Sequence, residues 1–130
     1  MLWSAFECTA SNLREKEENL LLNKNDADVI ALKQVQAKNT MYYDLQNSLG
    51  FVDETDATFQ DILDTHEAKL QEALSNIQLS LYYIEQGGNS DSQNRAKAKY
   101  YTGQYDNYKR SFPLLVNDPN QRMSTRVMSR

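Results

Sequence analysis

The 130-residue sequence has few of the residues that most often interrupt regular structure. It holds only 4 glycines and 2 prolines, whereas strand-rich folds need frequent turns and place both residue types in them. The shortage argues against a strand-rich fold and favours long helices. With 40% hydrophobic and 25% charged residues, the chain has the length and composition of one ordinary globular domain.

Long apolar runs are also lacking, and we expect no secretion signal. The N-terminal sequence MLWSAFECTASNLREKEENLLL has neither a basic start nor a continuous apolar core. No later run approaches the roughly 18 apolar residues of a membrane span. We therefore expect a soluble protein without a membrane span, in the cytoplasm or within an assembled particle.

Cysteine and histidine, which do much of the nucleophilic and metal chemistry of proteins, occur once each. Cys8 has no cysteine partner for a disulfide or a zinc site, and its neighbours Trp3 and Phe6 favour a small buried residue over a reactive thiol. The positions three and four residues from His66 hold Ile62, Leu63, Lys69 and Leu70. This helix face offers no carboxylate for a Glu-x-x-His metal site, so His66 is interpreted as a packed or partly exposed residue.

Other catalytic and binding motifs are missing too. The sequence contains no glycine-rich phosphate loop and no recognisable nucleophile–base pair. An acidic run begins at Asp53, but Ala57 occupies a ligand position of a calcium loop and Thr58 stands where such a loop needs glycine. We therefore predict a non-enzymatic protein with no cofactor and no metal.

Charge is unevenly divided along the chain. Residues 1–91 hold 6 basic and 16 acidic residues, a net charge of −10, while residues 92–130 hold 8 basic and 2 acidic residues, a net charge of +6; together they give −4. Folding the basic part against the acidic part of the same chain would satisfy this division. Packing the tail of one copy on the body of another would do so equally.

Apolar residues recur at helical spacing through most of the chain, which predicts helices at 4–22, 26–49, 58–86 and 93–111. Asn and Asp residues at 23–26 supply a break and a new N-cap. The acidic run of Asp53, Glu54 and Asp56 suits the start of the third helix, because the dipole there favours negative charge. Gly87 and Gly88 end that helix.

The second predicted helix has an inner stripe at Val29, Leu32, Val35, Asn39, Tyr42, Leu45 and Leu49. Gly50 then ends the helix as a left-handed cap would. Asn39 falls within the stripe, where a buried amide would fix the register between helices. The alternative is a surface residue at a loosely packed point.

The third predicted helix is the longest. Its stripe nearly follows a seven-residue repeat, at Phe59, Leu63, His66, Leu70, Ala73, Ile77, Leu81 and Ile84. Such a repeat is typical of long helices that pack nearly parallel or antiparallel to others.

Tyrosines and basic residues alternate in the run RAKAKYYTGQYDNYKRSF, residues 95–112. Its aromatic stripe lies at Ala98, Tyr101, Tyr105, Tyr108 and Phe112. A stripe at this spacing is typical of a packing seam, whereas rings that stack on bases sit exposed on sheets or in grooves. The acidic remainder of the chain would also repel phosphate. The run is therefore interpreted as a helix that closes the fold or joins two copies, and nucleic acid is not expected as a partner.

Pro113 ends the fourth helix and divides the chain into a helical bundle at 1–112 and a strap with a basic tail at 113–130. Asp118 and Pro119 make a good helix start. A helical tail would place three basic residues on one face: Arg122, Arg126 and Arg130. Such a tail resembles a docking peptide for an acidic groove on its own body or on a neighbouring subunit. Weak binding to a membrane surface and a frayed, disordered end are the alternatives.

The run NDADVIALKQVQAKNTMYYDLQNS covers about 25 of the 130 residues. It resembles the helix-turn-helix of secretion-needle subunits in its Asp turn, in a Gln one turn into the helix and in an aromatic residue further on. It lacks the proline that usually follows that Asp. The resemblance implies a filament or secretion component.

Together these patterns predict an all-α fold, an antiparallel helical hairpin or bundle of about four helices with a short C-terminal tail helix. The predicted function is that of a non-enzymatic structural or adaptor subunit, which packs its helices against other protein subunits or its own copies in a virion, tail or secretion apparatus. The alternative is a small acidic inhibitor or chaperone that binds a basic surface through the carboxylates between Asp53 and Glu72. The residues predicted to contact a partner are Tyr101, Tyr105, Tyr108, Arg122, Arg126, Arg130, Asp56, Asp61 and Asp64.

Overall fold

The computed structural model describes residues 1–8, 13, 24–87 and 92–116. Within these ranges the chain forms four α-helices and no β-strand, which confirms the predicted all-α bundle. The helices are α2 (Lys24–Leu49), α3 (Ala57–Thr65), α4 (Glu67–Gly87) and α5 (Ser92–Ser111). Two short 3-10 turns, η1 (Trp3–Ala5) and η3 (Phe112–Leu115), flank them. The predicted tail helix, with Arg122, Arg126 and Arg130, lies outside the described residues.

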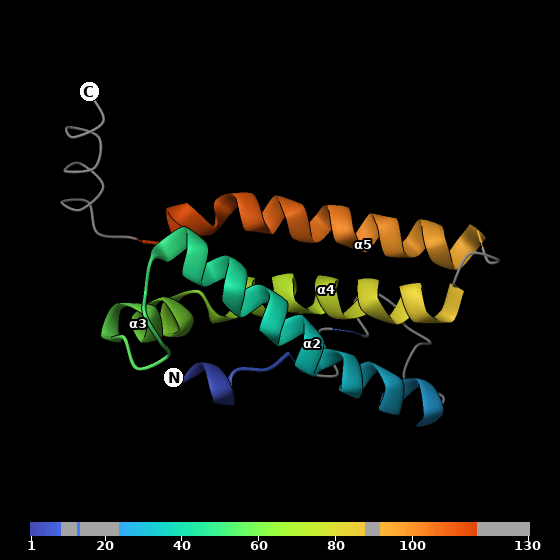
Figure 1. Cartoon of the computed structure of the whole chain (residues 1–130), viewed down its shortest axis with the longest axis horizontal. Coiled ribbons are helices and arrows are strands. Elements are labelled where there is room, and N and C mark those ends of the chain that lie inside the picture. The colour runs from blue at the N-terminus through green and yellow to red at the C-terminus, as the bar shows by residue number, and fades with distance from the viewer. Residues whose placement is uncertain (9–12, 14–23, 88–91, 117–130) are drawn as a thin grey trace.

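Helices α4 and α5 run antiparallel side by side, and α2 crosses obliquely in front of α4 (Figure 1). The N-terminal segment runs along the opposite edge of α4 from α5. Helix α4 is therefore the centre of the bundle, and every residue from Ala73 to Ser80 is buried. A helix covered on all sides needs partners for its polar side chains. The Ser75 hydroxyl and the Asn76 amide donate to the Glu72 carbonyl at 2.7 and 3.0 Å.

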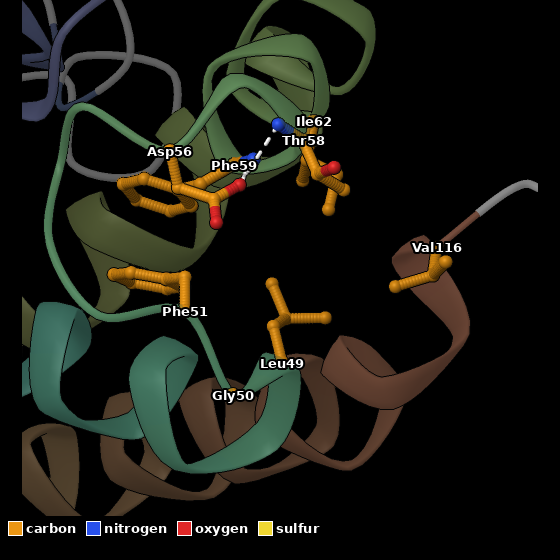
Figure 2. A pocket seen from close by; sticks show the side chains of 8 residues that line it. All are labelled: Leu49, Gly50, Phe51, Asp56, Thr58, Phe59, Ile62 and Val116. Carbon is orange, nitrogen blue, oxygen red and sulfur yellow. Dashed lines mark hydrogen bonds between the residues drawn. The ribbon is translucent and has the colours of Figure 1, made fainter.

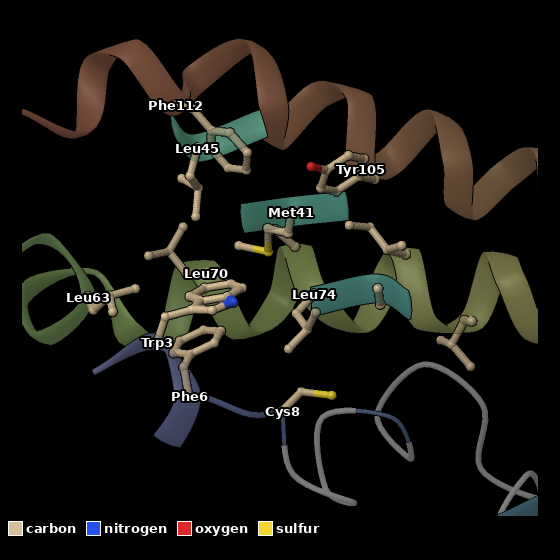
Figure 3. Close-up of a cluster of buried hydrophobic side chains, with 14 of the residues drawn as sticks. Trp3, Phe6, Cys8, Met41, Leu45, Leu63, Leu70, Leu74, Tyr105 and Phe112 are labelled. Carbon is tan, nitrogen blue, oxygen red and sulfur yellow. The ribbon is translucent and has the colours of Figure 1, made fainter. Parts of the chain in front are cut away.

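The core joins side chains from every described helix (Figure 3). Fully buried members include Phe6, Met41, Leu45, Leu63, Leu70, Leu74 and Phe112. At one end of the bundle, an aromatic cluster ties the N-terminal segment to α2 and α3. Trp3 stacks on Phe6 at 4.9 Å between ring centroids, and Phe51 stacks on Phe59 at 3.8 Å. These rings hold the start of the chain and the loop after α2 against the same core.

The predicted third helix is broken at His66. This residue ends α3 with φ −114° and ψ 26°, and α4 starts at Glu67. The prediction of one helix over 58–86 was wrong at this point, because no glycine or proline marks the break in the sequence. The bend turns α3 away from the direction of α4 (Figure 1). Phe59 of α3 thereby contacts the rings of Trp3 and Phe51, and Leu63 is fully buried.

The prediction of a helix at 4–22 was wrong over residues 4–8, the part of its start that the structure describes. Residues 3–5 form only the turn η1, and Phe6 has the extended dihedrals φ −75° and ψ 133°. Phe6 and Cys8 are nevertheless buried, as the apolar pattern predicts. The remainder of that predicted helix, except Leu13, lies outside the described residues.

The second predicted helix is confirmed, although it begins at Lys24 and not at 26, and its predicted C-terminal cap is confirmed as well. Gly50 has φ 76°, a left-handed conformation that glycine adopts without steric cost. Its amide donates to the Gln46 carbonyl at 2.8 Å. Asp56 then caps α3, since its Oδ1 accepts the amides of Thr58 and Phe59 at 2.8 and 3.1 Å.

The inner stripe predicted for this helix was wrong at three of its positions. Leu32 and Val35 are 71% and 63% exposed, and Asn39 is exposed too. The side that faces α4 carries Ala37, Met41 and Leu45 instead. Both sides of α2 are apolar, so periodicity alone does not say which one is inside. The buried register role proposed for Asn39 is therefore wrong within this chain.

Candidate interaction surface

The tyrosine stripe of α5 is a packing seam inside the chain. Tyr101 and Tyr105 are each 6% exposed, and Tyr108 is half-buried. The Tyr101 ring stacks on Tyr83 of α4 at 6.1 Å between centroids. The described fold thus places the first two predicted contact tyrosines in the interior of one chain.

One polar contact within this seam joins α5 to α2. The Tyr105 hydroxyl donates to Asp44 Oδ2 at 2.5 Å, and Lys109 Nζ lies 3.6 Å from Asp44 Oδ1. Asp44 is only 9% exposed. Burial, together with the hydrogen bond to Asp44 and its charge, raises the pKa of Tyr105 far above its ordinary value. Tyr105 is therefore a neutral donor that satisfies a buried carboxylate.

The acidic residues predicted to contact a partner lie on or beside α3. The Asp56 carboxylate is used as the helix cap. Asp61 and Asp64 are exposed, and Asp64 pairs with the amino group of Met1 at 3.0 Å. Thus only Asp61 of these three acids has no role described within the fold.

A small cavity lies beside this acidic region (Figure 2). Its volume is about 170 Å³, and it lies between the end of α2, the start of α3 and Val116. Its lining residues are Leu49, Gly50, Phe51, Asp56, Thr58, Phe59, Ile62 and Val116. The lining offers one carboxylate, already engaged as a cap, and no second titratable group. The cavity therefore has no catalytic constellation.

Metal-binding clusters and membrane-spanning helices are both absent from the described part of the chain. No group of three or more His, Cys, Asp or Glu side chains there is arranged to hold a metal ion. No helix within the same residues combines the length and the apolar character that crossing a membrane requires.

The surface that stands out is the outer face of α2, which consists of Leu32, Val35, Gln36, Asn39, Thr40 and Tyr43. All six residues are exposed, with Leu32, Val35 and Tyr43 at 71%, 63% and 64%. None of the six carries a charge. Helix α2 crosses in front of α4 (Figure 1), and the exposure of these six residues places them on the side of α2 that faces away from the bundle.

The charged residues in the same stretch of α2 are used within the chain. Lys33 Nζ lies 3.3 Å from Glu85 of α4. Lys38 donates to the Trp3 carbonyl at 2.7 Å and lies over the Trp3 ring, 5.4 Å from its centroid. Asp44 accepts from Tyr105. In this stretch of α2 the charged side chains contact the rest of the chain, while apolar side chains are exposed. An ordinary surface helix has the opposite arrangement, with its charges in water and its apolar residues inward.

Helix α5 provides a direct comparison within the same molecule. It has 20 residues against the 26 of α2. Its exposed charged residues are Arg95, Lys99, Asp106, Lys109 and Arg110. The lack of charge is therefore specific to the outer face of α2 and is not shared by the exposed side of α5.

The sequence contained a signal for this face, but periodicity assigned it to the core. The predicted stripe included Leu32, Val35 and Asn39, half of the outer face. The useful signal was that Lys33, Lys38 and Asp44 all fall on other sides of the same helix. A stripe of amides and apolar residues without charge fits a core and an interface equally well.

Cys8 was predicted to be a buried residue, and it is 8% exposed. Its Sγ donates to Gln78 Oε1 at 2.8 Å. Burial, supported by the charges of Glu7 and Glu72, raises the pKa of the Cys8 thiol from 9.0 to about 12. The thiol is therefore neutral in the folded protein at ordinary pH.

This environment predicts slow alkylation of Cys8. Near pH 8 the folded protein should react with iodoacetamide at least about a hundredfold more slowly than the protein unfolded in urea, because the thiolate is the nucleophile. Since the folded pKa is the higher one, stability should also fall as pH rises from 9 toward 12, where only the unfolded thiol ionises. Mass spectrometry of quenched samples measures the rate. Equal rates in both states would contradict the burial of Cys8.

Comparisons with protein families, with curated proteins and with solved structures find no match to this chain. The fold is that of an all-α helical bundle, a fold class that does not by itself imply a function.

Proposed function

We propose that this protein is a non-enzymatic structural or adaptor subunit that packs against other protein chains in a larger assembly, and that the outer face of α2 is its docking surface. The observation that carries the proposal is the inverted polarity of α2. Its lysines and its aspartate over residues 32–44 contact the chain itself, while Leu32, Val35 and Tyr43 face outward.

The energetics of such a face favour a protein partner. Fully burying a Leu or Val side chain contributes about 1.5 to 3 kcal/mol relative to leaving it in water. The cores of protein interfaces are depleted of charge and enriched in aromatic residues such as tyrosine. The face combines three large exposed side chains with three uncharged polar ones, Gln36, Asn39 and Thr40, which supply hydrogen bonds without a cost for burying charge.

The alternative function, an acidic inhibitor or chaperone, has less support. It depends on the carboxylates around α3, but Asp56 caps that helix and Asp64 pairs with Met1. Asp53 also accepts hydrogen bonds from the amide and hydroxyl of Thr55, which lower its pKa. Fewer acids are therefore free for a basic partner than the sequence predicts.

Photo-crosslinking in cells of the natural source tests the proposed docking surface. A photoreactive phenylalanine analogue replaces Gln36 on the outer face of α2 or, as a matched control, the exposed Asn107 on α5. We expect a protein adduct of one defined mass from position 36 and none from position 107. Adding Leu32→Glu should abolish that adduct, because a carboxylate would have to be buried at the contact.

The same variant controls for folding. Leu32 is 71% exposed, so Leu32→Glu should change the free energy of unfolding by no more than about 0.5 kcal/mol. No adduct from position 36, or equal adducts from positions 36 and 107, would contradict the proposed function.

A further inference from the structure

The outer face of α2 can be matched against candidate occupants by charge. A basic segment, such as the arginine-bearing tail of residues 117–130, would find no acid among the six residues of this face and one exposed acid, Asp28, in line with them. An acidic segment would find no base there. The suitable occupant is another exposed helix face that is itself uncharged and partly apolar.

The described surface of this chain contains such a face, namely the outer face of α2 itself. We propose that a second copy of the chain occupies it, with the two α2 helices antiparallel across a twofold axis that passes between residues 36 and 39. The inference rests on the proposed function and identifies the partner at the same docking surface. A twofold contact of this kind places the same patch of each copy against the other.

The order of residues along the face supports the antiparallel arrangement. Any helix face can be superposed on itself after reversal, so the positions of the residues alone do not favour antiparallel over parallel helices. An axis between residues 36 and 39 places each residue opposite the residue of the second copy whose number adds with its own to 75. The side chains that are opposite each other in this arrangement are also chemically compatible. The resulting pairs are Leu32 with Tyr43, Val35 with Thr40, and Gln36 with Asn39 of the second copy.

Each pair joins compatible groups. Leu32 meets the Tyr43 ring, so the largest exposed apolar groups of the face cover each other at both ends of the contact. Val35 packs on the methyl group of Thr40. The amides of Gln36 and Asn39 exchange hydrogen bonds beside the axis, as polar residues within helix interfaces do when they fix register. Asn39 would then have the register role assigned from the sequence, but between copies.

The flanks of the contact are compatible with two like chains. Asp28 lies opposite Asn47 of the second copy, so like charges do not face each other there. Each chain has a net charge of −4, but the six residues of the outer face carry none of it, and among the described residues Asp28 is the one exposed acid that continues this side of α2. Lys33 and Lys38, which border the face, are held by Glu85 and by the Trp3 carbonyl.

The size of the face predicts a weak dimer. The stretch from residue 28 to residue 47 is about 28 Å long at 1.5 Å per residue. One helix pair of this length falls at the low end of specific interfaces, so we expect a dissociation constant on the order of micromolar. Dimerisation should therefore depend on protein concentration.

Disulfide trapping with Asp28→Cys and Asn47→Cys tests the arrangement. Both positions are exposed and lie outside the six-residue face, so neither change removes a contact of the proposal. In the antiparallel pair residue 28 lies beside residue 47 of the second copy, whereas the two copies of residue 28 are about 28 Å apart. Under mild oxidation an equimolar mixture of the two variants should give a disulfide dimer roughly a hundredfold faster than either variant alone. Wild-type protein, with only the buried Cys8, is the control.

Each outcome has a separate meaning. A fast mixed dimer that Leu32→Glu abolishes supports the inference. Fast dimers from each variant alone indicate parallel helices, which overturns the inference and leaves the docking surface intact. No disulfide dimer in any combination, with a photo-adduct from position 36 to a different protein, overturns the second copy but keeps the proposed function. No disulfide dimer and no adduct contradict both.

Discussion

Replacing Leu74 by alanine is expected to lower the free energy of unfolding by about 3 to 5 kcal/mol. Leu74 is fully buried in the middle of α4, the helix that the rest of the bundle surrounds (Figure 3). Because neighbours approach it from several elements, the structure has little freedom to fill the cavity left by the missing methyl groups. Urea unfolding followed by circular dichroism measures the change. A loss below about 1 kcal/mol would contradict the central position of α4.

Ile84→Ala is the matched control for this prediction. Ile84 belongs to the same helix and has an aliphatic side chain of the same size, but it is 55% exposed. We expect a loss of less than about 1 kcal/mol, because most of the removed surface already contacts water. Similar losses at positions 74 and 84 would mean that α4 is not buried as described.

The second large effect is expected at the buried contact between α5 and α2. Tyr105→Phe removes the hydroxyl that donates to Asp44 and should lower stability at neutral pH by about 2 kcal/mol, since a buried carboxylate loses a hydrogen bond. Tyr100→Phe, at a residue that is 59% exposed one position from Tyr101, should change it by no more than about 0.5 kcal/mol.

This effect also has a predicted pH dependence. Burial and Asp44 raise the pKa of Tyr105 above its ordinary value of 10.0, so the tyrosine stays neutral in the folded chain while it ionises in the unfolded one. The stabilisation is complete below pH 10 and declines as pH rises beyond it. The difference between wild type and Tyr105→Phe should therefore shrink between about pH 9 and pH 11. A difference that stays constant or grows would contradict this assignment.

Several elements were predictable because local chemistry determines them. Gly50 was predicted to be a left-handed cap and is one. Asp56 was predicted to lie at the start of a helix because of its charge, and there it is the N-cap of α3. The seam of α5 was predictable for a similar reason, since aromatic residues at steps of three and four align on one side of a helix. Its buried members are Ala98, Tyr101, Tyr105 and Phe112.

Other features depend on tertiary contacts that periodicity does not encode. The break at His66 has no glycine or proline, and it arises where α3 turns toward Trp3 and Phe51. Phe6 is buried in an extended segment although its spacing from neighbouring apolar residues is helical. In both cases packing on the aromatic cluster outweighs local helix preference.

The outer face of α2 was misassigned for a different reason. An amphipathic pattern shows that a stripe avoids water, but the partner that covers it can belong to the same chain or to another. For Met41 and Leu45 the partner is the core of this chain, whereas nothing in the described residues covers Leu32 and Val35. Such a distinction needs the three-dimensional structure.

The central claim, that two copies of this protein associate through the uncharged outer face of α2, is tested most directly by light scattering over a range of protein concentrations. The mass should rise with concentration toward twice the 15.0 kDa of one chain. It should change little between about 0.1 M and 1 M NaCl, because salt screens charges and the six residues of the outer face carry none. Val35→Glu should weaken association at least about tenfold, while Ile84→Glu, at an exposed apolar residue outside the face, should not. A mass of one chain at every concentration, or association that salt or Ile84→Glu abolishes as readily as Val35→Glu does, would contradict the claim.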